Sequence, residues 1–186
     1  MIRTVKRILP LLFALLVLIP QTAGCRKTED AKDITAEVKD NGTPLSELHY
    51  APALTLACRG QETRAICFSA EWKADGAAID ACGMFMFEYY LNGDVEPLKA
   101  TSGDTVEFRF ETMPDRYEVR AWDAAGITAD YDYSQANEYT EITVTDNRFV
   151  FPEEGIFLYQ LHAEWDERDG VGGDAAYVFA VDSSRK

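Results

Sequence analysis

Strict alternation of apolar and polar side chains is the sequence feature that most restricts how this chain can fold. In the segment 157–165 the odd-numbered residues are Phe, Tyr, Leu, Ala and Trp, whereas the residues between them include Gln160, His162 and Glu164. Shorter segments with related patterns lie at 106–111, 117–122, 142–144 and 177–181. Successive side chains of a strand point to opposite faces of a sheet, so the pattern predicts half-buried strands. No part of the domain shows a convincing helical stripe.

Turn-forming residues separate these segments at intervals of about ten residues, as in antiparallel all-β domains. They lie at 92–94, 102–104, 114–115, 146–147 and 169–170. The segments 54–56 and 66–68 flank the polar stretch 59–63, which we interpret as a hairpin. We therefore predict one all-β domain over residues 50–183, built as an antiparallel β-sandwich.

The sequence before the longest predicted strand indicates a type of sandwich. Residues 154–157 (Glu-Gly-Ile-Phe) resemble the corner that precedes strand F of immunoglobulin-type domains, which implies an immunoglobulin-like fold. Phe157 stands where that family has its corner tyrosine, and no cysteine follows it to form the usual disulfide between the two sheets. The chain would therefore be a divergent relative.

A closer resemblance covers most of residues 52–181. Its motifs are PALTL at 52–56, GDTV at 103–106, PD at 114–115 with VRAWD at 119–123, and AEW at 163–165 with GG at 172–173 and YVF at 177–179. Together they are similar to an uncharacterised extracytoplasmic domain on lipoproteins of clostridia-like bacteria, which also resembles the C-terminal extension of some antibiotic-sensor-type membrane peptidases. The resemblance implies a cell-envelope setting and supplies no catalytic residues.

The first 24 residues are typical of a secretory signal peptide. Arg3, Lys6 and Arg7 precede an apolar run, 8–19, whose twelve residues would extend about 18 Å as a helix, well short of a hydrocarbon core of roughly 30 Å. Ala23, Gly24 and Cys25 then resemble the lipobox of bacterial lipoproteins, although Thr22 stands where leucine is usual. This resemblance implies cleavage between Gly24 and Cys25 and lipidation of the Cys25 thiol.

The composition of the remaining chain favours an exported, acidic domain on a tether. Residues 1–24 contain three basic and no acidic side chains, so their removal changes the formal charge from −14 to −17. Such a charge argues against nucleic acid as a partner. Residues 26–47 are highly charged and almost free of aromatic side chains, which predicts a flexible tether over 25–49 that spans about 25–30 Å.

Three cysteines follow Cys25. Cys58 and Cys67 flank the first predicted hairpin and are the candidate disulfide pair, whereas the remaining Cys82 has no obvious partner. The alternative is that both thiols stay reduced, because buried cysteine often behaves as a small apolar residue. The chain has no paired Cys-x-x-Cys spacing of the kind that zinc requires.

An acidic segment has part of the spacing of a calcium-binding loop. Its oxygen-bearing side chains fall at loop positions 1, 3, 5, 9 and 12, and are those of Asp130, Asp132, Ser134, Glu138 and Glu141. Position 6 is Gln135 instead of the glycine that the sharp turn requires. We therefore prefer an acidic loop between two strands and keep a calcium site as the alternative.

The segment 84–90 is unusually aromatic, with apolar residues at successive positions. One interpretation is a binding strand that presents the rings of Phe85, Phe87, Tyr89 and Tyr90 to a ligand or partner. We prefer a central or loop-covered strand, because a long exposed apolar edge promotes aggregation.

The sequence contains none of the usual catalytic constellations. Only two histidines are present, His49 near the tether and His162 on the more polar side of its strand, and there is no Gly-x-Ser-x-Gly motif. We therefore predict a non-enzymatic lipoprotein, anchored at the extracytoplasmic face of the cell membrane. Its domain would bind a protein or envelope component through the 85–90 strand and nearby loops. The alternative is a sensory or small-ligand accessory domain, with calcium as the sole candidate cofactor.

Overall fold

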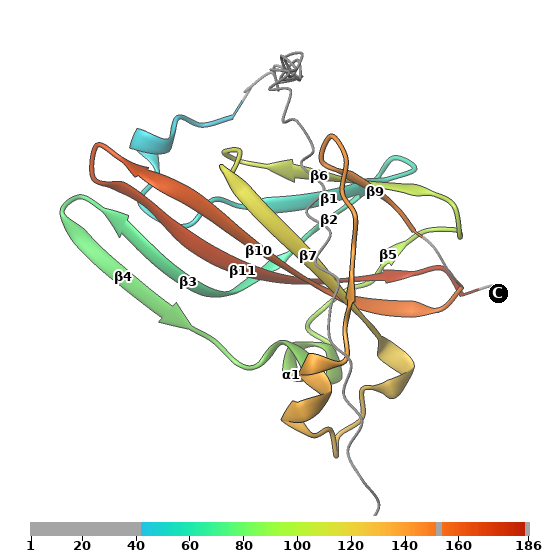
Figure 1. The fold of residues 1–186 in the computed structure, drawn as a ribbon. Coiled ribbons are helices and arrows are strands. Elements are labelled where there is room, and N and C mark those ends of the chain that lie inside the picture. The colour runs from blue at the N-terminus through green and yellow to red at the C-terminus, as the bar shows by residue number, and fades with distance from the viewer. Residues whose placement is uncertain (1–41, 152–153, 185–186) are drawn as a thin grey trace, which may run out of the picture. The chain divides into compact units, whose positions relative to one another are not determined.

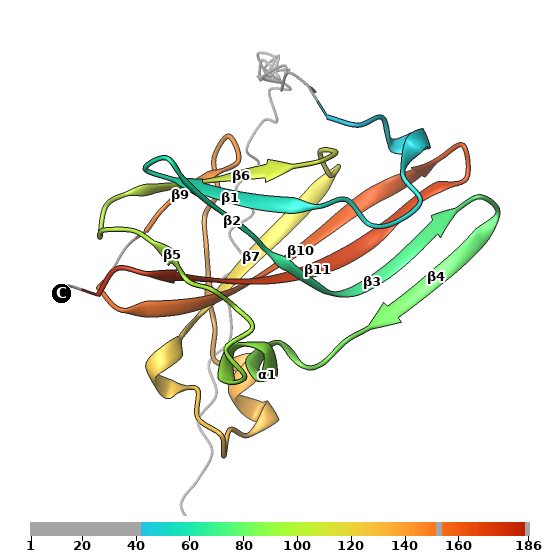
Figure 2. The same ribbon diagram turned by 180° about the vertical axis from the view of Figure 1, so that it is seen from behind.

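The computed structural model describes residues 42–151 and 154–184, which belong to one compact unit, residues 39–186. Gly24, Cys25, the predicted signal segment and most of the predicted tether lie outside the described residues. Two sheets built mainly from antiparallel strands pack face to face (Figures 1 and 2). The prediction of an all-β antiparallel sandwich is therefore confirmed.

The smaller sheet has four strands in the order β2–β1–β6–β9. Their bounds are β1 Leu54–Cys58, β2 Gln61–Arg64, β6 Thr105–Phe110 and β9 Arg148–Val150. Arg59 and Gly60 have φ angles of 51° and 78°, so a two-residue turn joins β1 to β2. The predicted hairpin is thus wrong in its second strand, because 54–56 pairs with β2, whereas 66–68 begins a strand of the other sheet.

The larger sheet has seven strands, six of them in the order β4–β3–β11–β10–β7–β8, with β5 parallel to β11. Their bounds are β3 Ile66–Ala74, β4 Ala77–Cys82, β5 Leu98–Lys99, β7 Arg116–Asp123, β8 Thr140–Glu141, β10 Ile156–Arg168 and β11 Val171–Asp182. The segments predicted at 106–111, 117–122, 157–165 and 177–181 coincide with β6, β7, β10 and β11. The strand predicted at 142–144 is wrong in position, because β8 ends at Glu141.

The main core lies between the two sheets. It contains the odd-numbered side chains of β10 from 157 to 165, as the alternation predicted, and their neighbours on β1, β3, β6 and β11. The rings of Tyr159 and Phe179 stack with centroids 5.0 Å apart and planes 2° apart, and Trp72 meets Trp165 edge to face at 5.5 Å. All four side chains are almost completely buried, which fixes the register of the central strands.

A second core covers part of the outer face of the larger sheet. Its buried residues include Met86, Phe87, Trp122, Leu158 and Val178. The short helices of the structure are η1 (Leu45–Glu47), α1 (Met86–Leu91), η2 (Ala124–Gly126) and η3 (Tyr133–Asn137). Of these, α1 contributes Met86 and Phe87 to this core, and Figure 1 shows the helix beside the larger sheet. None of the helices in the described part of the chain is long and apolar enough to cross a bilayer.

The expectation of a strand at 85–90 is therefore wrong. Met86–Leu91 is helical, and Phe87 packs edge to face against Trp122 at 5.9 Å. Phe85, Tyr89 and Tyr90 are partly buried against the same cluster, so the aromatic side chains cover the sheet and do not form an exposed binding strand. A six-residue helix has little stability of its own, so this packing is what holds it.

Candidate binding face on the larger sheet

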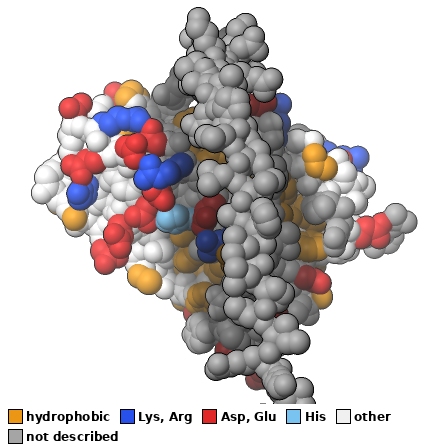
Figure 3. All heavy atoms as spheres, viewed as in Figure 1, with side chains coloured by type: hydrophobic (Ala, Val, Ile, Leu, Met, Phe, Trp, Pro, Cys, Tyr) orange, Lys and Arg blue, Asp and Glu red, His pale blue; other side chains and the backbone are white. Residues whose placement is uncertain are grey.

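The outer face of the larger sheet is covered at one end and open at the other. Leu158 on β10 and Val178 on β11 belong to the second core, whereas Glu164 and Asp174 farther along the same strands are partly exposed. Figure 3 shows acidic side chains, some basic ones and a histidine over the region of β3, β4, β10 and β11. We call this region, with the adjoining part of β7, the open face.

Four carboxylates lie in one row across the open face. The strand register places Asp80 of β4 opposite Glu71 of β3, Glu71 opposite Asp174 of β11, and Asp174 opposite Glu164 of β10. Arg116 of β7 ends the row opposite Glu164. We call the four acidic residues the carboxylate row. Like charges in directly opposed positions destabilise a sheet, so this arrangement opposes folding.

Positive charge is concentrated at one end of the row. Arg116 pairs with Glu164 and with Asp166, the latter through Nη1 and Oδ1 at 2.9 Å. In the described part of the chain, Glu71 and Asp80 form no ion pair. The β4 end of the row is therefore the less neutralised end.

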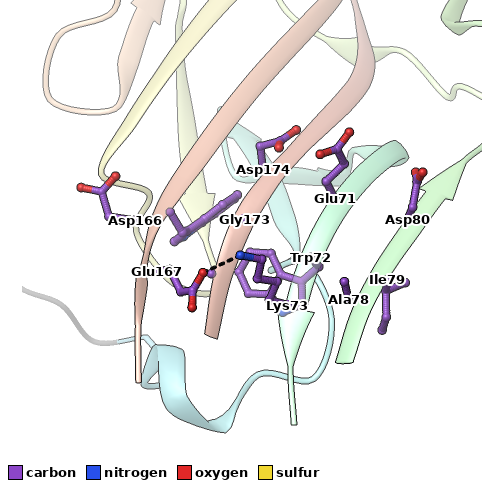
Figure 4. A pocket seen from close by; sticks show the side chains of 12 residues that line it. Glu71, Trp72, Lys73, Ala78, Ile79, Asp80, Asp166, Glu167, Gly173 and Asp174 are labelled. Atoms are coloured by element: carbon purple, nitrogen blue, oxygen red, sulfur yellow. Dashed lines mark hydrogen bonds and ion pairs between the residues drawn. The ribbon is translucent and has the colours of Figure 1, made fainter. Parts of the chain in front are cut away.

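A hollow with a volume of about 470 Å³ lies beside this less neutralised end. Its lining includes five carboxylates and one basic side chain; the acidic members are Glu71, Asp80, Asp166, Glu167 and Asp174. The basic one, Lys73, places Nζ 2.7 Å from Oε2 of Glu167, and this hydrogen bond raises the pKa of Lys73 (Figure 4). In the same view Asp80, Glu71 and Asp174 point to one side of the sheet. The hollow therefore attracts positively charged groups.

Bare backbone forms part of the wall of the hollow. Gly173 of β11 has a φ of 147°, and a Cβ added there would lie 2.0 Å from the carbonyl oxygen of Glu71. Glycine is therefore required for β11 to approach β3 this closely. The pairing of β10 with β11 is irregular between Trp165 and Arg168, next to the same glycine.

The two histidines each contact carboxylates. His162 lies on the open face, with Nε2 3.3 Å from Oδ1 of Asp174 and Nδ1 4.0 Å from Oε1 of Glu164. His49 is exposed, with Nδ1 2.6 Å from Oδ2 of Asp75. Both contacts are partly exposed, and that of His162 lies beside the middle of the row.

The structure does not gather the predicted calcium ligands. Asp132 is the N-cap of η3 and accepts a hydrogen bond from the Ser134 amide at 3.0 Å, while Glu141 lies in β8 opposite Arg120 of β7. The other two acidic candidates, Asp130 and Glu138, are exposed. Within 42–151 and 154–184 no group of three or more His, Cys, Asp or Glu side chains is placed to hold a metal ion. The position of Asp132 is therefore explained by its role as a helix cap and requires no metal ion.

The candidate disulfide is also not formed. Cys58 and Cys67 are both free thiols; Cys58 is buried at the end of β1, opposite Gln61, whereas Cys67 is exposed in β3, opposite Tyr177. The two residues belong to different sheets because the chain crosses from one sheet to the other after β2. Burial is the main cause that raises the pKa of both thiols, so neither is activated as a thiolate.

The sequence analysis missed the β3–β4 hairpin on which the open face depends. The missed signal is Asp75-Gly76, a dipeptide typical of two-residue hairpin turns, between Trp72 and Ile79. Both turn residues have the positive φ that such a turn needs, 53° and 73°. Comparisons with family models, curated proteins and solved structures found no match for this chain.

Proposed function

We propose that the chain is a membrane-anchored extracytoplasmic lipoprotein whose sandwich domain binds a protein or envelope component through its open face. In this proposal Cys25 carries the lipid, and the tether places the domain beyond the headgroups. The immunoglobulin-like relationship and the absence of enzyme activity stay predictions.

The carboxylate row is the observation that carries the proposal. Glu71 faces an acidic residue on both sides, although the inner face of the same sheet packs apolar side chains into the main core. Folded proteins tolerate such local conflicts mainly where function requires them. Contact with a positively charged surface would remove the repulsion, so the row supports a binding role for this face.

Photocrosslinking in intact cells tests the proposal. A photoreactive amino acid replaces Glu118, whose side chain is 55% exposed on the larger sheet, or Arg109, which is 50% exposed on the smaller sheet. We expect a discrete crosslinked envelope component from position 118 and none from position 109. Equal crosslinking from both positions, or from neither, would contradict binding through the open face.

The anchor is tested in the same cells with Cys25→Ala. We expect incorporation of a labelled fatty acid into the original chain, loss of that label in the variant, and loss of the position-118 crosslink when the variant is released into the medium. Labelling that persists in the variant would refute lipidation at Cys25. A crosslink that persists in this variant would show that the lipid anchor is dispensable for binding.

A further inference from the structure

The β4 strand leaves one edge of the larger sheet unpaired. No described strand lies beyond β4, and both ribbon views place it at the outside of the hairpin (Figures 1 and 2). Its sequence is AAIDAC, and five of its six residues are exposed. The strand contains no lysine, proline or bulge, which commonly protect an edge from pairing, and its single charged residue is Asp80. The edge is therefore available to another strand.

The hydrogen-bond alternation shows which residues face this edge. The Gly83 amide donates to the Phe68 carbonyl at 2.6 Å, which continues the β3–β4 register. Pairs in an antiparallel ladder alternate between bonded and non-bonded positions. Ala78, Asp80 and Cys82 therefore lie at non-bonded positions, and their backbone N–H and C=O groups turn away from β3.

We propose that the free edge of β4 binds an extended, basic segment of a partner protein as an added strand. Ala78, Asp80 and Cys82 supply the backbone hydrogen bonds, and Lys or Arg side chains of the segment enter the acidic hollow. This inference rests on the proposed binding function and names the chemistry of the partner. Strand addition of this kind obtains affinity from the main chain and specificity from alternate side chains.

Charge complementarity favours a basic segment as the strand that pairs with β4. Every second side chain of an added strand points to the hollow, and neighbouring strands lie about 4.8 Å apart. A basic side chain opposite Asp80 is thus directly adjacent to that carboxylate and can extend over Glu71, neither of which has an ion pair in the described part of the chain. A second copy would instead bring another acidic β4 edge, from a chain of formal charge −14, against the first.

Synthetic peptides test the inference on the full chain in detergent. The probe is a fluorescent eight-residue peptide with lysine alternating with threonine or valine, and its binding is followed by anisotropy. One control has glutamate in place of lysine. A second keeps every lysine but carries N-methyl groups on alternate amides, which blocks strand pairing without changing the charge.

We expect the lysine peptide to bind and both control peptides to bind at least about tenfold more weakly, since each backbone hydrogen bond contributes roughly a two- to tenfold factor. Ala78→Pro removes one outward N–H and should weaken binding by a similar factor; proline is tolerated at an edge whose N–H faces solvent. Glu71→Gln should weaken binding about two- to fivefold, whereas Glu62→Gln, on β2 of the smaller sheet, should leave it unchanged.

Three results would overturn the inference, and each has a different consequence for the proposed function. Equal binding of the N-methylated peptide would show that the open face attracts basic peptides without strand pairing. Absence of peptide binding, with the position-118 crosslink intact, would show a binding face that uses other chemistry. A dimer in light scattering that Ala78→Pro dissociates would assign the edge to a second copy. If Ala78→Pro does not fold, as judged by circular dichroism, the N-methylated peptide decides alone.

Discussion

Removing the charge at the centre of the carboxylate row should stabilise the domain. Glu71→Gln keeps the size of the side chain and removes two directly opposed like-charge pairs, those with Asp80 and Asp174. Each such pair destabilises a sheet by about 0.2–1 kcal/mol. Because these side chains are at least partly exposed, solvent screening favours the lower part of that range. We therefore expect the free energy of unfolding to rise by about 0.5–1 kcal/mol at low salt.

Urea unfolding at two salt concentrations measures this gain. At 1 M salt the screening length is about 3 Å, so the difference between Glu71→Gln and the original chain should largely disappear. Glu118→Gln is the matched control, because Glu118 Oε1 lies 2.6 Å from Nη2 of Arg120, and its removal should give no gain. If Glu71→Gln is neutral or destabilising at low salt, the repulsion argument fails, and with it the main support for a binding role of the row.

Three further outcomes follow from the packing. Phe87→Ala should lower the free energy of unfolding by about 3–5 kcal/mol, because the Phe87 side chain is only 1% exposed. Leu91→Ala should lower it by much less, because Leu91 is 38% exposed. Similar urea midpoints for the two variants would contradict the helical packing. Gly173→Ala should cost about 1–3 kcal/mol, since the added Cβ would clash with a carbonyl oxygen, and an unchanged melting temperature would refute that close approach. In the native protein a thiol reagent should modify Cys67 faster than Cys58, because Cys67 is exposed and Cys58 is buried. Protection of both thiols until a reductant is added would instead reveal a disulfide.

The strands that the sequence predicted well are those with one face on the main core and one face toward solvent. In β10 the core side chains Tyr159 and Leu161 alternate with Gln160 and His162, so the sequence alternates in step with the buried and the solvent-facing side of the strand. The same reasoning failed for 85–90, where tertiary packing overrides local preference. Aromatic residues favour strands on average, yet these cover a sheet face as a helix.

The open face was beyond sequence reasoning for a different reason. The row joins Glu71, Asp80, Glu164 and Asp174, which come from four strands, and a shift of one residue in any strand would move its member to the opposite face. Alanine-rich β4 has little strand signal of its own apart from the Asp75-Gly76 turn. Register is set by the packing of the core, so the position of these charges is a consequence of tertiary structure.

The two ends of the outer sheet face differ in what they contribute to the stability of the domain. Along β10 and β11, Leu158 and Val178 hold the second core, whereas Glu164 and Asp174 on the same strands belong to neither core. Charge substitutions at the open end should therefore leave the fold intact, and those that relieve repulsion should strengthen it. If Glu71→Gln gains stability and loses affinity for a basic peptide, it would show the trade-off between stability and function that is expected of a functional surface.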